Sequence, residues 1–463
     1  MALRQGKTYE IDMCNGAILP KLLQFTLPLM LSSILQLLFN AADIIVVGRF
    51  AGDNSLAAVG STTSLINLLV NLFVGLSVGA NILAARFYGA NERENLRQTV
   101  HTAMLLGLIS GFFLAAAGVL GARTVLGWMQ SPAEVRPLAA LYLRIYFLGM
   151  PANMLYNFGA ALLRATGDTR RPLYYLSAAG VVNVVLNMIF VILFHLDVAG
   201  VAIATVISQC ISAVLVVRCM MRDAGAIHLE LRQLHIYTIR LKQILQVGLP
   251  AGFQGILFSL SNVFIQSAVN SFGEVVVAGN AAAANIETFI YASMNAVYQA
   301  TISFTSQNYG AGRFNRIRPI LLRALGCVLV IGCILGTLSV FFGPRLLHIY
   351  SDSPAVIAAG MKRLSVVCSV YFLCGMMEIM VGILRGMGYS VMPMLVSLIG
   401  ACGLRLVWLA TIFRLPAFHT ISTLYWSYPV SWLITFTVHF LCYLWASKRL
   451  KLHLTEGKPL RTF

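Results

Sequence analysis

Residues 173–194 read LYYLSAAGVVNVVLNMIFVILF, a run without a charged side chain. A helix needs about 20 mostly apolar residues to cross roughly 30 Å of hydrocarbon, so this run is long enough to span a membrane. Two charged residues, Arg170 and Arg171, lie just before this run. The stretch therefore predicts a membrane-spanning helix, and it carries two asparagines one helical turn apart, Asn183 and Asn187.

The composition excludes a water-soluble protein. Of the 463 residues, 59% are hydrophobic and 11% charged, and the mean hydropathy is +0.81, which is more apolar surface than a soluble domain carries. The nine cysteines form no C-x-x-C pair, so they predict no redox or metal site. The net charge of +17 comes from Lys and Arg in short loops between apolar runs, so it reports membrane topology and predicts no nucleic-acid partner.

Apolar runs of spanning length recur along the whole chain. Bounded by charged or Gly/Pro-rich loops, twelve such runs emerge. Their expected limits are 19–46, 56–86, 98–120, 138–163, 173–194, 200–221, 241–270, 276–308, 319–341, 357–384, 393–413 and 422–447. The sequence therefore predicts an all-α polytopic membrane protein with twelve transmembrane helices.

The distribution of basic residues predicts the orientation of these spans. With alternate loops on opposite sides, 24 Lys and Arg lie with the two termini, and about eight lie on the other side. The smaller group comprises Arg49, Arg123, Arg136, Arg144, Arg345, Lys362, Arg363 and Arg414. Only Arg405 is expected deep inside a span. Because cytoplasmic loops carry the excess of basic residues, both termini are expected in the cytoplasm.

A sequence repeat divides the chain into two halves. Tyr88-Gly89-Ala90 recurs as Tyr309-Gly310-Ala311, an offset of 221 residues, and the same offset relates further loop residues. Each copy holds six spans, so we expect two six-helix lobes related by a pseudo-two-fold axis along the membrane normal, with a substrate cavity between them. The expected segments are an N-terminal segment 1–18, an N-lobe 19–221, a cytoplasmic linker 222–242, a C-lobe 243–447 and a cytoplasmic tail 448–463.

Carboxylates inside spans are the most informative polar residues, because a buried charge is costly in hydrocarbon and usually functional. Of the sixteen Asp and Glu, thirteen fall in tails or loops, and the exceptions are Asp43, Glu287 and Glu378. No phosphate-binding loop, hydrolase motif or metal-ligand cluster occurs, so neither an enzyme nor a cofactor is expected. Uphill transport would then draw on an ion gradient.

Asp43 is the expected centre of an ion-coupling site in the first lobe. Gln36 and Asn40 precede it at helical spacing and share its face, and spans 5 and 6 contribute further polar stripes. Burial disfavours a charged carboxylate, so Asp43 could bind and release a proton, while the same oxygens could hold Na⁺. The alternative is a helix-end group paired with Arg49. The expected ion-coupling residues are Asp43, Asn183, Asn187 and Thr205, with Asp43, Asn183 and Thr205 as the possible Na⁺ ligands.

Polar residues in the second lobe predict a substrate cavity. Glu287 opens a stripe at a spacing of four that marks one face of span 8. Glu378 lies seven residues before Arg385, and an intramembrane ion pair with Arg405 is its alternative role. The expected substrate-cavity residues are Gln36, Asn40, Gln254, Glu287, Tyr291, Asn295, Gln299 and Glu378.

Taken together, these motifs resemble the multidrug and toxic compound extrusion (MATE) family. The resemblance covers about residues 15 to 447 and rests on the order and spacing of several motifs. These are Asn40-Ala41-Ala42-Asp43 followed by Val47-Gly48, the paired Tyr-Gly-Ala turns, the paired Leu-Arg-x-x-Gly loops, and Asn183-Val184-Val185-Leu186-Asn187. Gln307-Asn308-Tyr309-Gly310-Ala311 favours the bacterial branch that includes the DinF-like members.

The resemblance implies a bacterial inner-membrane antiporter, acting as a monomer, that expels cationic amphipathic drugs or metabolites in exchange for H⁺ or Na⁺. The family's span 1 carboxylate corresponds to Asp43, and its accompanying Asn and Thr to Asn183 and Thr205. Where the family usually has Asp, this chain has Asn187, and the lost charge weakens the Na⁺ interpretation. The alternative is a lipid-linked precursor flippase of the same superfamily, which would line its cavity with Arg or Lys.

Overall fold

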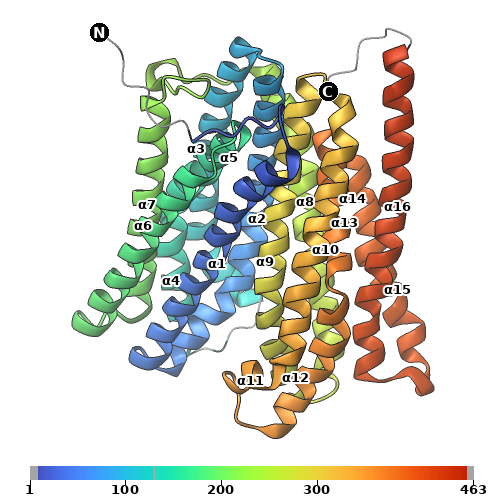
Figure 1. Ribbon diagram of the computed structural model, residues 1–463. Coiled ribbons are helices and arrows are strands. Elements are labelled where there is room, and N and C mark those ends of the chain that lie inside the picture. The colour runs from blue at the N-terminus through green and yellow to red at the C-terminus, as the bar shows by residue number, and fades with distance from the viewer. Residues whose placement is uncertain (1–8, 129–131, 133, 456–463) are drawn as a thin grey trace. The chain divides into compact units, whose positions relative to one another are not determined.

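The protein is described here by a computed structural model that covers residues 9–128, 132 and 134–455 (Figure 1). Within these ranges every regular element is a helix. Ten of the helices are long and apolar enough to cross a membrane, and two bent helix pairs each pass the same test as one span. The expected all-α protein with twelve spans is confirmed. Residues 1–8 of the expected N-terminal segment and 456–463 of the expected tail lie outside the described residues.

Unit 1 is the compact body that contains residues 9–13 and Leu27–Gly252. The helices α2 to α7 pack against one another within it and run from blue to green in Figure 1. Its elements are α1 (Ile18–Phe50, from Leu27 onward), α2 (Asp53–Gly89), α3 (Arg93–Trp128), α4 (Arg136–Leu148), α5 (Met150–Ala165), α6 (Arg170–Asn187), η1 (Met188–Leu193), α7 (Asp197–Arg222), η2 (Leu231–Gln233) and the first part of α8 (Thr238–Asn270).

Unit 2 contains residues 14–26 and the chain from Phe253 onward. Within it, α9 packs against α10, α12 and α13, and α16 packs against α12 and α13. Its elements are the rest of α8, α9 (Glu274–Gly310), η3 (Phe314–Arg316), α10 (Ile317–Phe341), α11 (Gly343–His348), α12 (Pro354–Val367), η4 (Cys368–Val370), α13 (Phe372–Gly386), α14 (Val391–Ser397), η5 (Leu398–Gly403), α15 (Leu404–Ala410), η6 (Ile412–Arg414), η7 (Pro416–Phe418) and α16 (Ile421–Thr455).

The fourth and tenth spans are broken rather than straight. The fourth bends by 47° where α4 gives way to α5, next to Gly149 and Pro151. Proline has no backbone N–H and its ring crowds the preceding turn, so a helix bends or ends there. The tenth bends by 45° between η4 and α13, at Tyr371, without a proline at the break. The two breaks fall at equivalent places in the sequence repeat.

Within unit 1, α2 and α8 cross at two pairs of glycines. Gly75 and Gly79 lie one turn apart on α2, and Gly248 and Gly252 do the same on α8. A Cβ atom on Gly79 would lie 2.5 Å from the Ile244 carbonyl oxygen and 2.8 Å from the Gly248 nitrogen, and one on Gly75 would overlap the backbone of Gly252. The two backbones therefore approach as closely as small residues allow, which is how membrane helices gain packing energy without a hydrophobic driving force.

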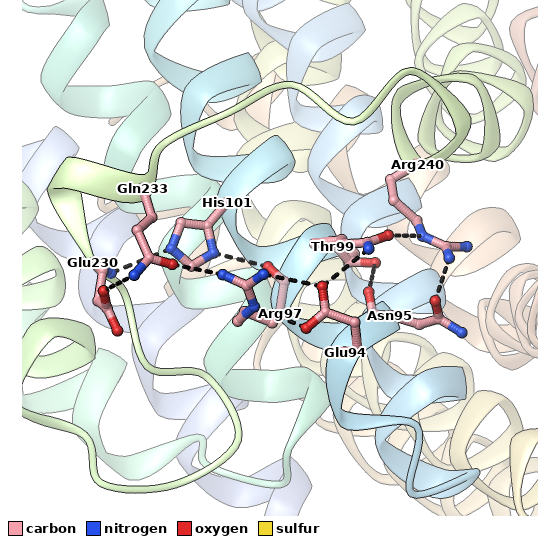
Figure 2. Close-up of polar contacts among 9 residues, drawn as sticks. Glu94, Asn95, Arg97, Thr99, His101, Glu230, Gln233 and Arg240 are labelled. Atoms are coloured by element: carbon pink, nitrogen blue, oxygen red, sulfur yellow. Dashed lines mark hydrogen bonds and ion pairs between the residues drawn. The ribbon is translucent and has the colours of Figure 1, made fainter.

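The linker after α7 is bound to the first turns of α3 (Figure 2). Arg97 donates to the side-chain carbonyl of Gln233 at 2.6 Å, and Arg240 donates to side chains of the same helix. The Glu230 N–H donates to Nε2 of His101 at 3.3 Å, so Nδ1 of that ring carries the proton and donates to the Arg97 carbonyl at 2.9 Å. These bonds hold the linker against unit 1 as an ordered segment.

The glycine crossing predicts a position-dependent effect of side chains on stability. Gly79→Leu should lower the free energy of unfolding by about 1–3 kcal/mol or more, because the added atoms force two backbones apart. Gly60→Ala is the matched control on the same helix: a Cβ there meets nothing within 4 Å, so the lower backbone entropy of the unfolded chain should stabilise it by a few tenths to 1 kcal/mol. Thermal unfolding of the purified proteins in detergent measures both. An unchanged melting temperature for Gly79→Leu would contradict the packing argument.

Candidate functional site

The four expected ion-coupling residues form one hydrogen-bonded chain inside unit 1. The Asn187 amide donates to the Asp43 carboxylate and, at 3.3 Å, to Oδ1 of Asn183. The Asn183 amide in turn donates to Oγ1 of Thr205 at 3.4 Å. Three helices, α1, α6 and α7, therefore bring these side chains together. Asn183 and Asn187 are buried, and Asp43 and Thr205 are half-buried.

Within this hydrogen-bonded chain, the side-chain oxygen of Asn187 is the one buried acceptor that receives no hydrogen bond. Its Oδ1 is buried and accepts no hydrogen bond from any residue that the structure describes, and a buried acceptor without a partner is costly. Directly after Asn187 the helix widens into the π-helical turn η1, a distortion that is frequent at functional sites. The site thus offers an unused oxygen next to a carboxylate.

Other expected residues of α1 lie differently. Gln36 and Asn40 are exposed, and neither forms a hydrogen bond with Asp43. Asp43 lies seven residues before the end of α1 at Phe50, and it forms no ion pair with Arg49 among the described residues. The alternative role of Asp43 as a paired helix-end group is therefore wrong.

Two tyrosines near Asp43 were not identified from the sequence. Tyr142 and Tyr146 of α4 stack with ring centroids 5.9 Å apart, and both lie within electrostatic range of Asp43. Their spacing of four residues places them on one helix face. The spacing of the two tyrosines in the sequence could have indicated an aromatic helix face. It does not show which neighbouring helix that face of α4 contacts.

In unit 2, Glu287 is held by a buried arginine. The Arg363 guanidinium donates to both carboxylate oxygens, each at 2.7 Å, and to Oδ1 of Asn280 at 2.7 Å. Tyr425 donates to the same Asn280 oxygen at 3.2 Å. Glu287 and Arg363 are 5% and 7% exposed, so this bidentate pair is enclosed by α9, α12 and α16 and the Glu287 charge is already neutralised.

The placement of Arg363 corrects the sequence analysis. Arg363 was expected on the outer side of the membrane, and Arg405 was expected to be the one basic residue deep in a span. Arg363 instead lies buried in α12, and Arg385 is also buried, at 3% exposed. The expectation was wrong because charge was counted along the sequence, whereas Glu287 neutralises Arg363 from a helix far away in the chain.

The remaining residues of the expected cavity differ in exposure. Tyr291 is exposed, Asn295 and Gln299 are half-buried, and only Glu287 of this stripe is buried. Gln254 is buried and accepts a hydrogen bond from Nη2 of Arg385 at 2.8 Å. Arg385 also donates to the Tyr298 hydroxyl.

Glu378 and Arg405 do not form the ion pair considered as an alternative. Glu378 is buried and makes no hydrogen bond or ion pair with a described residue. Arg405 donates from Nε to the Ser431 hydroxyl at 2.9 Å and packs against aromatic rings. Two intramembrane charges of unit 2 are thus left without an opposite partner in residues 9–128, 132 and 134–455.

A single family model, MatE, matches the chain twice, over residues 28–189 and over residues 250–411. The two matches cover well over half of the sequence, and their starting points, residues 28 and 250, lie within one residue of the offset of the internal repeat. The chain belongs to the MatE family. This confirms the resemblance drawn from the motifs, whereas the placement in the DinF-like branch stays a prediction.

Curated relatives match the MatE chain over most of its length. Probable multidrug resistance protein YpnP of Bacillus subtilis is 28% identical over 404 residues, which is 85% of this chain and 88% of YpnP. The FAD transporter of Shewanella oneidensis is 24% identical over 345 residues, 73% of this chain and 75% of the relative. Probable multidrug resistance protein NorM of Thermotoga maritima is 22% identical over 394 residues, 83% and 84% of the two chains.

Solved structures show the same fold. An outward-facing multidrug resistance MATE family transporter is 23% identical, with a TM-score of 0.88 over 97% of this chain and 99% of that chain. A MOP superfamily transporter from Pyrococcus furiosus, reported with a binding pocket of reverse polarity, is 22% identical, with a TM-score of 0.89 over the same shares. At these identities the likeness shows the fold and no more.

The buried pair of unit 2 predicts a large asymmetry between single and double variants. Glu287→Gln should lower the free energy of unfolding by about 3–5 kcal/mol, because it leaves the Arg363 charge buried without a partner. The double variant Glu287→Leu/Arg363→Met removes both charges and should be close to the wild type. Melting temperatures of the purified proteins in detergent test this. A double variant as unstable as the single one would show that packing, and not charge, holds α9 to α12.

Proposed function

We propose that this MatE chain is a secondary antiporter that exports cationic amphipathic drugs or metabolites in exchange for protons. It works by alternating access as a multi-pass protein of the bacterial inner membrane. Two relatives named as multidrug resistance proteins support the drug export. The observation that carries the coupling is the hydrogen-bonded chain from Asp43 to Thr205, because it contains a single titratable group.

The proton would be exchanged at the Asp43 carboxyl group. In its ionised form this group accepts the Asn187 N–H. A proton turns one carboxyl oxygen into a donor, and the Asn187 amide holds an unused acceptor, Oδ1, for that donor. The amide can therefore bond to both protonation states. Each state fixes a different arrangement of Asn187, on which Asn183 and Thr205 depend in turn.

Na⁺ is the second candidate for the coupling ion, and the orphan Oδ1 of Asn187 is the observation that favours it. Together with the Asp43 carboxylate and the oxygens of Asn183 and Thr205, it supplies the neutral and charged oxygens that hard cations prefer. Among these groups, however, only the Asp43 carboxylate carries a charge. A single carboxylate suits a proton site at least as well, so we place H⁺ first.

The flippase alternative needs several free basic groups to hold a pyrophosphate. Arg363 is neutralised by Glu287, and Arg385 is bonded to Gln254 and Tyr298. This leaves Arg405 as the one buried arginine of unit 2 whose charge meets neither a carboxylate nor an amide among the described residues. We therefore favour the exporter.

A gradient of one pH unit supplies about 1.36 kcal/mol per proton, and 100 mV adds about 2.3 kcal/mol per charge, so one proton can drive substantial drug accumulation. Asp43→Asn should abolish uphill export of a cationic dye in proteoliposomes with an imposed pH gradient. Substrate binding should persist, because the amide is close to the carboxyl group in size and still hydrogen-bonds.

The matched control is Asp352→Asn, which removes an exposed carboxylate and should leave transport unchanged. Transport by Asp43→Asn driven by the pH gradient would place the coupling site elsewhere, with Glu378 as the next candidate. If a Na⁺ gradient, but not a pH gradient, drives the wild type, Na⁺ replaces H⁺ as the coupling ion.

The bias of basic residues to one side predicts the topology. In a variant whose native cysteines are replaced by serine, Ser351→Cys, between α11 and α12, should react with an impermeant maleimide added to intact cells. Arg232→Cys, in the linker, should react only after the cells are permeabilised. The reverse pattern would place both termini outside the cytoplasm.

A further inference from the structure

A groove with a volume of about 550 Å³ runs between α5 and α7 within unit 1, and this volume is typical of ligand pockets. Its walls are formed by Ala152 and Leu155 of α5 and by one face of α7 between Cys210 and Arg222. Apart from Arg218 and Arg222, the side chains that line this α5–α7 groove carry no charge and are small or apolar.

The α5–α7 groove begins where the fourth span bends. Ala152 directly follows Pro151, in the first turn of α5, and its small side chain leaves room beside Ala213 of α7. The two helices pack closely at Gly159, where an added Cβ atom would lie 2.2 Å from Cγ1 of Val216. Small side chains next to a close helix contact therefore leave a hollow in the surface of unit 1.

The groove lies on the side of α7 that faces away from the hydrogen-bonded chain around Asp43. Val214 comes nine residues after Thr205, and with 3.6 residues per turn it lies on the opposite side of the helix. Val214 is 63% exposed, and Cys210 and Met221 are exposed as well. Because α7 is a spanning helix, this exposed apolar face contacts lipid tails, which are as apolar as its side chains.

The length of the groove matches one leaflet of the bilayer. From Cys210 to Arg222 the helix rises by about 18 Å, and half of a hydrocarbon core of roughly 30 Å is about 15 Å. Both arginines lie in the last two turns of α7, and the apolar side chains line the rest of the groove. A phospholipid is divided in the same way, with a charged headgroup at the surface and acyl chains that are one leaflet long.

The two arginines at the end of the groove have no partner in the described chain. Arg218 and Arg222 are exposed, lie one turn apart, and form no hydrogen bond or ion pair with a described residue. The Asp223 carboxylate lies 3.7 Å from Nη1 of Arg171, and Asp168 also pairs with Arg171. Two guanidinium groups thus remain for an external anion, and their planar donors match the geometry of phosphate oxygens.

We propose that the α5–α7 groove binds one anionic phospholipid. An acyl chain lies along the apolar side chains, and Arg218 and Arg222 donate hydrogen bonds to the headgroup phosphate. Basic pockets between spanning helices recognise anionic headgroups in this way. In the proposed topology α7 leads into the cytoplasmic linker, so the lipid belongs to the inner leaflet. The inference depends neither on the exported substrate nor on the coupling ion, because lipid binding needs no gradient.

Native mass spectrometry of the purified full-length protein in detergent measures the binding of individual lipids. The probes are dioleoyl phosphatidylglycerol and dioleoyl phosphatidylcholine, which have the same acyl chains and differ in net charge. The wild type should bind its first phosphatidylglycerol at least about tenfold more tightly, because each arginine beside an anionic headgroup adds roughly fivefold in affinity. Equal affinities for the two lipids would overturn the inference.

A double variant removes the charge at the end of the groove. Arg218→Gln/Arg222→Gln should bind phosphatidylglycerol about tenfold or more weakly and change the affinity for phosphatidylcholine by less than about twofold. The matched control is Arg318→Gln/Arg323→Gln, which removes two exposed arginines of α10 that do not line the groove. It should leave both affinities unchanged. An equal loss in the control would show that net charge alone governs lipid binding, and the groove would not be a specific site.

Folding is measured separately from binding. Because the four replaced arginines are exposed, both double variants should melt at the wild-type temperature in detergent without added lipid. Phosphatidylglycerol should raise the melting temperature of the wild type and of the α10 control, because a ligand that binds only the folded state stabilises it. It should not raise that of Arg218→Gln/Arg222→Gln. An equal rise in all three proteins would contradict the assignment.

Val214→Trp tests whether the groove holds an acyl chain. The indole ring fills part of the groove while both arginines remain, so the affinity for both lipids should fall by about threefold or more as packing contacts are lost. Unchanged affinities would mean that the lipid does not lie in the groove. Oleate, an anion with a single chain, is the competing occupant. Displacement of phosphatidylglycerol by an equal concentration of oleate would assign the groove to single-chain acids and rule out the phospholipid.

Discussion

The hydrocarbon of a membrane solvates no charge, so each ionised side chain inside a spanning helix must be neutralised by the protein or by what the protein binds. Arg363 meets this demand with Glu287, and the pair joins α9 to α12 within unit 2. Arg385 meets it only in part, through an amide and a phenol. Arg405 meets it only through a hydroxyl group and aromatic rings, and Glu378 forms no hydrogen bond or ion pair with a described residue.

The two units differ in the ionisable groups that they hold inside their spanning helices. Unit 1 holds a single acid among neutral amides and a hydroxyl, a set that can follow the gain and loss of one proton without creating an unpaired charge elsewhere. Unit 2 holds several fixed charges of both signs, because arginine stays protonated at any physiological pH. The arginines among them do not change charge, so within this unit only a carboxyl group, such as that of Glu378, could exchange a proton.

The sequence predicts the spans well because length and apolar content decide whether a segment enters hydrocarbon. It also predicts that Asp43, Asn183, Asn187 and Thr205 lie together, since they lie on polar stripes of spans 1, 5 and 6 and the family resemblance places them in one site. The Glu287–Arg363 pair and the bend at Tyr371 could not be predicted. The pair links two helices far apart in the sequence, and the bend has no proline to mark it. The glycine spacing on α2 is visible in the sequence, but not the identity of the helix it meets.

The two π-helical turns also bear on the history of the chain. Both occur in the fifth span of their sequence copy, but η1 follows Asn187 and η5 precedes Arg405. Once the repeat is superimposed, they lie about three helical turns apart along the equivalent helix. A distortion inherited from the ancestral unit would occupy the same level in both copies. The distortion therefore does not follow the repeat, because each copy carries it at a different level, after an amide in the first copy and before a guanidinium in the second.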